Sequence, residues 1–167
     1  MRAATDPSPP VVATRPVWPW VTTALRVGLG AVALVAGLTK ISDLPASVRA
    51  VRAYQLLPEG LAVLIGNALP LVEVILGALL LLGLFTRVSA AAFGLMLVAF
   101  TIGIGSAWAR GLAIDCGCFG GGGAIDPGNT SYPLDLLRDV VLITVAAVLV
   151  RRPHSRLSLD SALDLSL

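Results

Sequence analysis

The chain has 167 residues, of which 56% are hydrophobic and only 13% are charged, and its formal net charge is +2. A soluble domain averages about 45–50% apolar and about 25% charged residues, so this composition is typical of a membrane protein. The small net charge gives no indication of a nucleic-acid partner, and a chain of this length fits one domain.

Residues 1–16 are polar and proline-rich, a composition typical of a disordered segment. The apolar run that follows is longer than the core of a typical cleavable signal peptide. We therefore expect an uncleaved first membrane span after a disordered N-terminal segment.

Long stretches with few or no charges predict four transmembrane helices, because a span needs roughly 20 mostly apolar residues. The predicted spans lie near residues 17–39, 60–84, 88–109 and 133–151. We expect an all-α integral membrane protein, with a four-transmembrane-helix bundle over residues 17–151. Residues 152–167 would form a cytoplasmic polar tail in which a short surface helix can form. We expect His154, in this tail, to be a solvated surface residue.

The loop after the first span carries the signals of a short helix. Ser42 or Asp43 can cap its start, and Pro45 suits its first turn. We expect this helix to lie in the membrane interface, with Tyr54 as an aromatic anchor and Pro58 at its end.

Basic residues on the two sides predict the orientation of the bundle. The cytoplasmic set would be Arg2, Arg15, Arg87, Arg151, Arg152 and Arg156, and the opposite set Lys40, Arg49, Arg52 and Arg110. This excess favours cytoplasmic termini in a multi-pass protein of the cell membrane. The loop that holds both cysteines then faces the extracytoplasmic side, where disulfides form and persist.

Two ionisable residues lie inside predicted spans, where such residues usually face a partner or a cavity. Arg26 follows Trp18 by eight residues and Glu73 precedes Gly83 by ten, so both lie about 12–15 Å from the same side. We predict that Arg26 and Glu73 face each other. We favour a buried ion pair that fixes helix register over the alternative, a proton or quinone site.

Both cysteines lie in IDCGCFGGGG, residues 114–123. A closed zinc site needs four ligands, and the only histidine is expected on the other side, so we predict no metal. A disulfide across one residue closes almost no loop and stabilises the fold little. Two inert thiols are one alternative. A redox-active pair fits better, because Gly117 can adopt a turn that lets Cys116 and Cys118 bridge, and strained, exposed disulfides exchange readily. We therefore expect an exposed pair.

The residues around the pair suggest how it would work. Phe119 would shield a sulfur or stack on a partner, and the glycines at 120–123 would leave a mobile, uncrowded approach for a partner's cysteine. Asp135, Arg138 and Asp139 share one helix face. This cluster either seats a short span or lets Arg138 stabilise a thiolate at Cys116 or Cys118.

The chain contains, in order, the motifs GLTKISDL, VRAYQLLP, LPLVEVILGALLLLGL, CGCFG and RD. In these motifs it resembles the MauE branch of the DoxX-like membrane proteins, over about residues 20–150. The resemblance implies a compact four-helix membrane bundle. It also implies a role in methylamine utilisation or related disulfide maturation, alongside a thioredoxin-like partner. Other DoxX-like proteins are linked to thiosulfate oxidation with quinone as the acceptor.

Taken together, we expect a redox protein of the cell envelope that exchanges disulfides with a thioredoxin-like protein through Cys116 and Cys118, with Arg138 tuning the thiolate. One cysteine pair must pass electrons to a second protein or to a cofactor, for which a quinone is the candidate. Two alternatives are a non-catalytic membrane assembly subunit and a quinone-linked oxidoreductase for a small sulfur compound.

Overall fold

The computed structural model describes residues 17–152 and 158–162. Its helices are α1 (Trp18–Ile41), α2 (Leu44–Ala53), α3 (Glu59–Leu82), α4 (Thr86–Ala109), α5 (Tyr132–Arg151) and α6 (Leu159–Ala162). Between α4 and α5 lie strands β1 (Ile114–Asp115) and β2 (Gly123–Ala124) and the 3-10 turn η1 (Pro127–Asn129). The predicted segment 1–16 and His154 lie outside the described residues.

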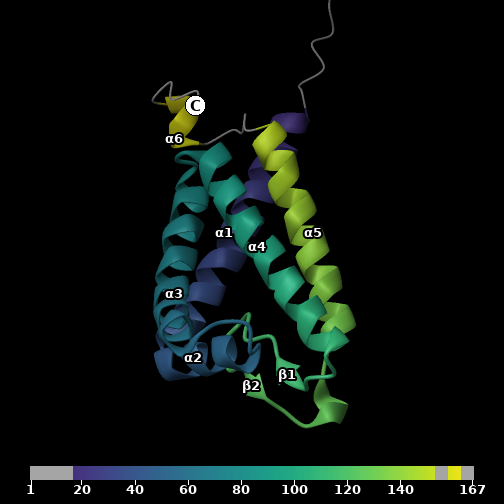
Figure 1. Cartoon of the computed structure of the whole chain (residues 1–167). Coiled ribbons are helices and arrows are strands. Elements are labelled where there is room, and N and C mark those ends of the chain that lie inside the picture. The colour runs from purple at the N-terminus through teal and green to yellow at the C-terminus, as the bar shows by residue number, and fades with distance from the viewer. Residues whose placement is uncertain (1–16, 153–157, 163–167) are drawn as a thin grey trace, which may run out of the picture.

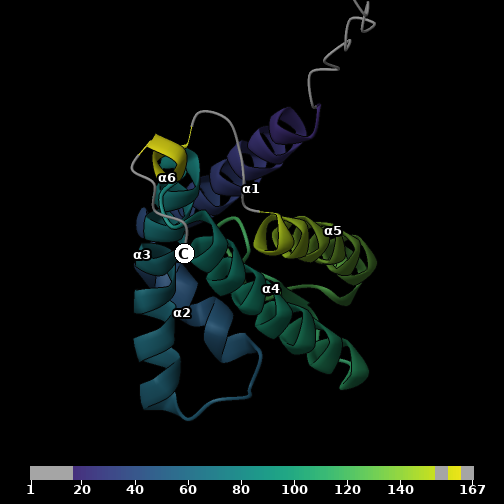
Figure 2. The same ribbon diagram turned by 90° about the horizontal axis from the view of Figure 1, so that it is seen from above.

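The four long helices form a ring in which α1 contacts α3, α3 contacts α4, α4 contacts α5, and α5 contacts α1. Figure 2 looks down this ring. Figure 1 shows α2, β1 and β2 together at one end of the bundle. The start of α1, the end of α5 and the short helix α6 lie at the opposite end. The segment with the cysteines is therefore separated from both described ends of the chain by the length of the bundle.

Among the described residues, α1, α3 and α4 are each long and apolar enough to cross a membrane. Their 24 residues correspond to about 36 Å at about 1.5 Å per residue, which exceeds a bilayer core of about 30 Å. The 20 residues of α5 have the length for a fourth span, but its first turns carry charges. The mainly helical, multi-span membrane architecture is confirmed, and the fourth span stays a prediction.

The outward face of the bundle is apolar. Large side chains stay exposed along its length, as at Leu64, Ile75, Leu95 and Ile102. A water-soluble protein rarely leaves so continuous an apolar surface open, whereas lipid tails cover it at no cost. The buried core lies inside the ring, where Leu29, Leu80, Phe93 and Leu149 belong to one cluster.

Small residues fix the register of α1 against α3. A Cβ atom at Gly37 would lie 2.7 Å from the carbonyl oxygen of Pro70, and one at Gly77 would lie 2.6 Å from the amide nitrogen of Leu34. No side chain fits at either place, so the two backbones pack directly against each other. This register decides which polar residues on the two helices can meet.

The helix α2 begins as the sequence predicts. Asp43 accepts a hydrogen bond from the amide of Ala46 at 2.9 Å, and Pro45 lies in the first turn. The helix ends at Ala53, earlier than Pro58, because Gln55 adopts a positive φ of 51° and the chain leaves the helical path. Pro58 instead precedes the first residue of α3.

A break in α3 provides the docking site for α2. Pro70 lies inside α3 and has no amide hydrogen, so it cannot donate to the carbonyl one turn earlier, at Gly66. The Ser47 hydroxyl of α2 donates to that carbonyl at 2.7 Å, in a buried position. A Cβ atom at Gly66 would lie 2.6 Å from the Cα of Val48, so α2 rests directly on the backbone of α3. The serine thus satisfies a carbonyl that lipid could not.

This arrangement predicts a coupling between Ser47 and Pro70. Ser47→Ala should lower the free energy of unfolding in detergent by about 1–3 kcal/mol, because a buried carbonyl loses its donor. The loss should shrink in a Pro70→Ala background, where the alanine amide supplies the donor. Thermal unfolding followed by circular dichroism measures both. Ser42→Ala is the matched control, since its hydroxyl bonds the Thr39 carbonyl at an exposed position. Equal losses in the two backgrounds would contradict the coupling.

Candidate functional site

The segment between α4 and α5 is fastened at its base by the first residue of α5. The Tyr132 hydroxyl donates to the carbonyl of Leu112 at 2.5 Å and accepts from the amide of Ile114 at 3.0 Å. Strands β1 and β2 pair antiparallel just beyond, with Ile114 opposite Ala124. Ile114 and Tyr132 are both buried in a small apolar cluster. The cysteines are therefore held on a closed loop, which we call the cysteine loop (residues 112–131).

Two glycines of the cysteine loop allow it to pack closely against α2. Gly117 and Gly122 have φ values of +67° and +99°, which other residues rarely adopt. A Cβ atom at Gly117 would lie 2.6 Å from the Cβ of Ala50 on α2, and Gly122 is crowded by the same alanine. The prediction of an uncrowded glycine run is wrong at Gly122, where α2 leaves no room for a side chain, whereas a Cβ atom at Gly123 would have nothing within 4 Å.

The two cysteines are free thiols in different surroundings. Cys116 is half-buried, whereas Cys118 is buried with 9% of its surface exposed. The Cys118 amide donates to the Cys116 sulfur at 3.4 Å, and the Cys118 thiol lies 3.9 Å from the Cys116 carbonyl oxygen. The prediction of an exposed pair is wrong for Cys118, because its side chain is buried and lines a pocket with Phe93 and Phe100.

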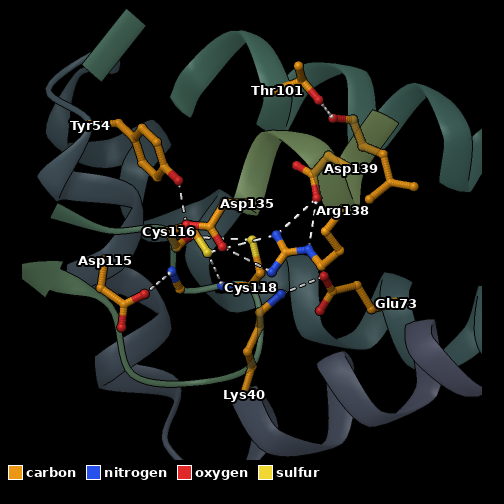
Figure 3. Close-up of polar contacts among 12 residues, drawn as sticks. Lys40, Tyr54, Glu73, Thr101, Asp115, Cys116, Cys118, Asp135, Arg138 and Asp139 are labelled. Atoms are coloured by element: carbon orange, nitrogen blue, oxygen red, sulfur yellow. Dashed lines mark hydrogen bonds and ion pairs between the residues drawn. The ribbon is translucent and has the colours of Figure 1, made fainter. Parts of the chain in front are cut away.

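Arg138, at the start of α5, connects the cysteines to the bundle (Figure 3). Its guanidinium lies 3.2 Å from Asp135 and 2.9 Å from Asp139, so the shared helix face predicted from the sequence is confirmed. Its Nη2 atom also lies 3.9 Å from the Cys116 sulfur. Phe119 is exposed and stacks on this guanidinium, with 5.2 Å between the Arg138 Cζ atom and the ring centre.

These contacts distinguish the two thiols electrostatically. The hydrogen bond from the Cys118 side chain, with smaller contributions from the Cys118 amide and Arg138, lowers the pKa of Cys116 against the opposing effect of burial. The same hydrogen bond and burial raise the pKa of Cys118. Cys116 is thus the sulfur favoured as a thiolate, and Cys118 is its proton-bearing donor.

Tyr54 is the link between α2 and the cysteine loop. The sequence suggests an interfacial anchor, but its hydroxyl donates to the carbonyl of Cys116 at 3.0 Å. Burial, with the nearby Cys118 and Cys116, raises the pKa of Tyr54, so the phenol keeps its proton. Only the aromatic character of Tyr54 was visible in the sequence, because its partner lies 62 residues away.

The predicted pair of Arg26 and Glu73 is wrong. Glu73 pairs with Lys40, whose Nζ atom lies 2.5 Å from Oε1, and the two side chains are 2% and 3% exposed respectively. Arg26 instead donates to the carbonyls of Leu80 and Leu81 near the end of α3.

Helix register explains this difference. Gly37 packs at the level of Pro70 and Val74, so Glu73 lies beside the last turn of α1, where Lys40 is. Depth counted from the ends of two helices does not give their register. Lys40 was not predicted as the partner of Glu73, because the first span was predicted to end near residue 39. Lys40 was therefore expected outside the bundle. Its spacing of three residues from Gly37 was the available signal, since such residues share a helix face.

The structure therefore brings Glu73, Cys118 and Arg138 to one pocket, which they line together with Asp139. Arg26 belongs to the other end of the bundle. A model of the family described as methylamine utilisation protein MauE matches residues 18–152. The chain belongs to the MauE family.

The region that matches MauE contains the four long helices, both cysteines and the buried Lys40–Glu73 pair. No curated protein and no solved structure matches this MauE-family chain.

The contacts of Cys116 predict its reactivity. Because its pKa is lowered, iodoacetamide should alkylate Cys116 at half the maximal rate at a pH below the usual range of a cysteine, and before Cys118. Cys118→Ala and Arg138→Gln should both move this midpoint upward, and at a pH below the midpoint a rise of about one unit slows alkylation by about tenfold. Rates are measured by mass spectrometry of the purified protein. Arg49→Gln, at an exposed arginine of α2, is the control. Prior modification of Cys118 would contradict this assignment.

Proposed function

We propose that this protein is a thiol–disulfide redox protein of the cell envelope, which exchanges disulfides with a thioredoxin-like partner through Cys116 and Cys118. The observation that carries the proposal is the asymmetry of the pair. One sulfur is half-buried and favoured as a thiolate by Cys118 and Arg138, while the other is buried and keeps its proton. Active dithiols commonly combine an accessible attacking thiolate with a second, resolving cysteine.

Because Cys116 is the more accessible of the two cysteines, it would react with the partner first. The Cys116 thiolate attacks one sulfur of a partner disulfide, and the other partner sulfur leaves as a thiolate, which gives a mixed disulfide. Cys118 then loses its proton and attacks the Cys116 sulfur, and the second partner sulfur leaves. The partner gains two electrons, and the chain ends with a Cys116–Cys118 disulfide. In the reverse direction, a partner thiolate attacks Cys116 and the partner leaves oxidised.

The family supports a biological setting for this chemistry. Its description names methylamine utilisation, so we propose that the partner belongs to that process or to another pathway of disulfide maturation in the envelope. The chain holds two cysteines in all, which form one pair. A full cycle therefore needs a second protein or a quinone to exchange electrons with the pair.

We also propose that the cysteine loop faces the extracytoplasmic side and that both termini are cytoplasmic. The described ends of the membrane domain lie together, opposite the cysteine loop (Figure 1). The basic residues Arg87, Arg151 and Arg152 lie at the end of the bundle that holds the start of α1 and the end of α5, which agrees with the positive-inside tendency. The opposite side is the oxidising one, where a disulfide persists.

Trapping the mixed disulfide tests the redox proposal. Cys118→Ser keeps the attacking sulfur and removes the resolving one, so it should accumulate a disulfide-linked complex in native membranes. Non-reducing gels and mass spectrometry should identify a thioredoxin-like protein linked through Cys116. Cys116→Ser should form no such complex. If neither variant traps a partner and both support the pathway fully, the protein is an assembly subunit and the redox proposal fails.

Thiol labelling tests the orientation. A membrane-impermeant maleimide should label Cys116 of the Cys118→Ser variant on intact cells. The matched control is Arg87→Cys in a chain that lacks both native cysteines, because Arg87 is exposed at the opposite end of the bundle. That cysteine should react only after the membrane is permeabilised. The opposite pattern would reverse the proposed topology.

A further inference from the structure

A small pocket lies inside the helix ring beneath the cysteine loop. Glu73, Cys118, Arg138 and Asp139 line it, and apolar side chains such as Phe93 and Phe100 complete its wall. Its cavity volume is ≈ 20 Å³, measured as the space open to the centre of a water molecule. A cavity needs about 10–15 Å³ by this measure to hold one water molecule, so the pocket has room for a single water beside the buried sulfur.

Two carboxyl oxygens in this pocket lack a hydrogen-bond partner among the described residues: Glu73 Oε2 and Asp139 Oδ2, both fully buried. The other oxygen of each group is satisfied, since Glu73 Oε1 binds Lys40 and Asp139 Oδ1 binds Arg138 (Figure 3). Leaving a buried carboxylate oxygen unpaired is costly, so each such oxygen needs an explanation. A proton or a bridging water on these oxygens would supply it.

The charges around the pocket also favour a bound proton. The cations are Lys40 from α1 and Arg138 from α5, and the acidic groups are Glu73 from α3, Asp135 and Asp139 from α5, and Cys116 of the cysteine loop. The residues of α4 that line the pocket, Phe93, Leu97 and Phe100, carry no charge, and Tyr54 of α2 keeps its proton. Two cations face three carboxyl groups and one thiol, so a proton released by Cys118 would enter a region rich in acidic groups.

The proposed exchange requires a proton acceptor at this place. Cys118 must lose its proton before it can attack the mixed disulfide, because the thiolate is the nucleophile. Its side chain is buried and lines the pocket. The pocket is thus the direct route for this proton.

We infer that Asp139 and Glu73 form the proton-accepting site for Cys118, with one water in the pocket as the carrier. This inference rests on the proposed function. The Cys118 S–H proton passes to the water, and a water proton passes to Asp139 Oδ2 or Glu73 Oε2. The Cys118 thiolate attacks the Cys116 sulfur, and the bond from Cys116 to the partner sulfur breaks. The partner sulfur leaves with the electron pair. When the Cys116–Cys118 disulfide is opened, the same site returns the proton to Cys118.

A small aromatic disulfide separates the two steps. The purified full chain in detergent is mixed with 4,4′-dithiodipyridine, and released thiopyridone is followed by its absorbance. The first release reports attack by Cys116, and the second reports resolution by Cys118. Asp139→Asn should slow the second phase about tenfold or more and leave the first within about twofold, as expected for loss of a proton acceptor. Glu73→Gln should act in the same direction.

The pH profile provides a readout that packing alone would not change. The second phase of the parent protein should become independent of pH once the carboxyl site is free to accept a proton. In Asp139→Asn it should keep rising with pH, because hydroxide must then remove the proton. Asp126→Asn and Glu59→Gln are the matched controls, since both acids are exposed and line no part of the pocket. These controls should release thiopyridone at the parent rates.

The outcomes separate this inference from the proposed function. If the parent protein releases a single equivalent of thiopyridone, Cys118 does not resolve the disulfide and the redox proposal fails. If both equivalents appear and Asp139→Asn and Glu73→Gln resolve at the parent rate, the redox proposal stands and the proton-accepting site is refuted. Equal slowing of both phases would also refute it, because that result indicates a purely structural role.

Discussion

The position of the cysteine pair depends on the guanidinium of Arg138. It binds Asp135 and Asp139 on its own helix, and it reaches both the Cys116 sulfur and the Phe119 ring across the cysteine loop. A guanidinium can do this because its five donors lie in one rigid plane whose faces stay free for stacking, which a lysine cannot reproduce. The charged side chains at the start of α5 and the cysteine loop thereby bind each other at the end of an otherwise apolar bundle.

The conformation of the cysteine loop also depends on a break in a distant helix. Pro70 frees the carbonyl of Gly66, Ser47 binds that carbonyl, and α2 is held on the side of α3. Ala50 of α2 then occupies the space that side chains at residues 117 and 122 would need. Gly117 and Gly122 are therefore the positions at which the cysteine loop packs closely against a helix that docks on α3. This explains why a stretch that looks flexible in the sequence has a defined path.

The sequence predicted the features that depend on composition and local pattern. Apolar stretches indicated the long helices, and Asp43 with Pro45 indicated the start of α2, because spans and caps are determined by neighbouring residues. The pairing of Arg26 with Glu73 failed because register between helices is set by where small residues allow contact. The prediction that Cys118 is exposed failed for a related reason, since the burial of Cys118 depends on helices that meet only in the folded chain. Arg138 was correctly placed near the cysteines because the cysteine loop leads directly into α5.

The asymmetry of the pair gives the membrane bundle a role beyond anchoring. A dithiol in water meets the partner sulfur and releases its proton through the same solvent. Nothing in its surroundings separates the path of the sulfur from the path of the proton. Here Cys116 is half-buried, and Cys118 is buried and lines a pocket with the buried carboxyl groups of Glu73 and Asp139. The partner sulfur and the proton would then travel in opposite directions from the same pair. Such a separation requires a helix bundle that buries the inner sulfur and holds Lys40 and Arg138 beside the carboxyl groups, as this one does.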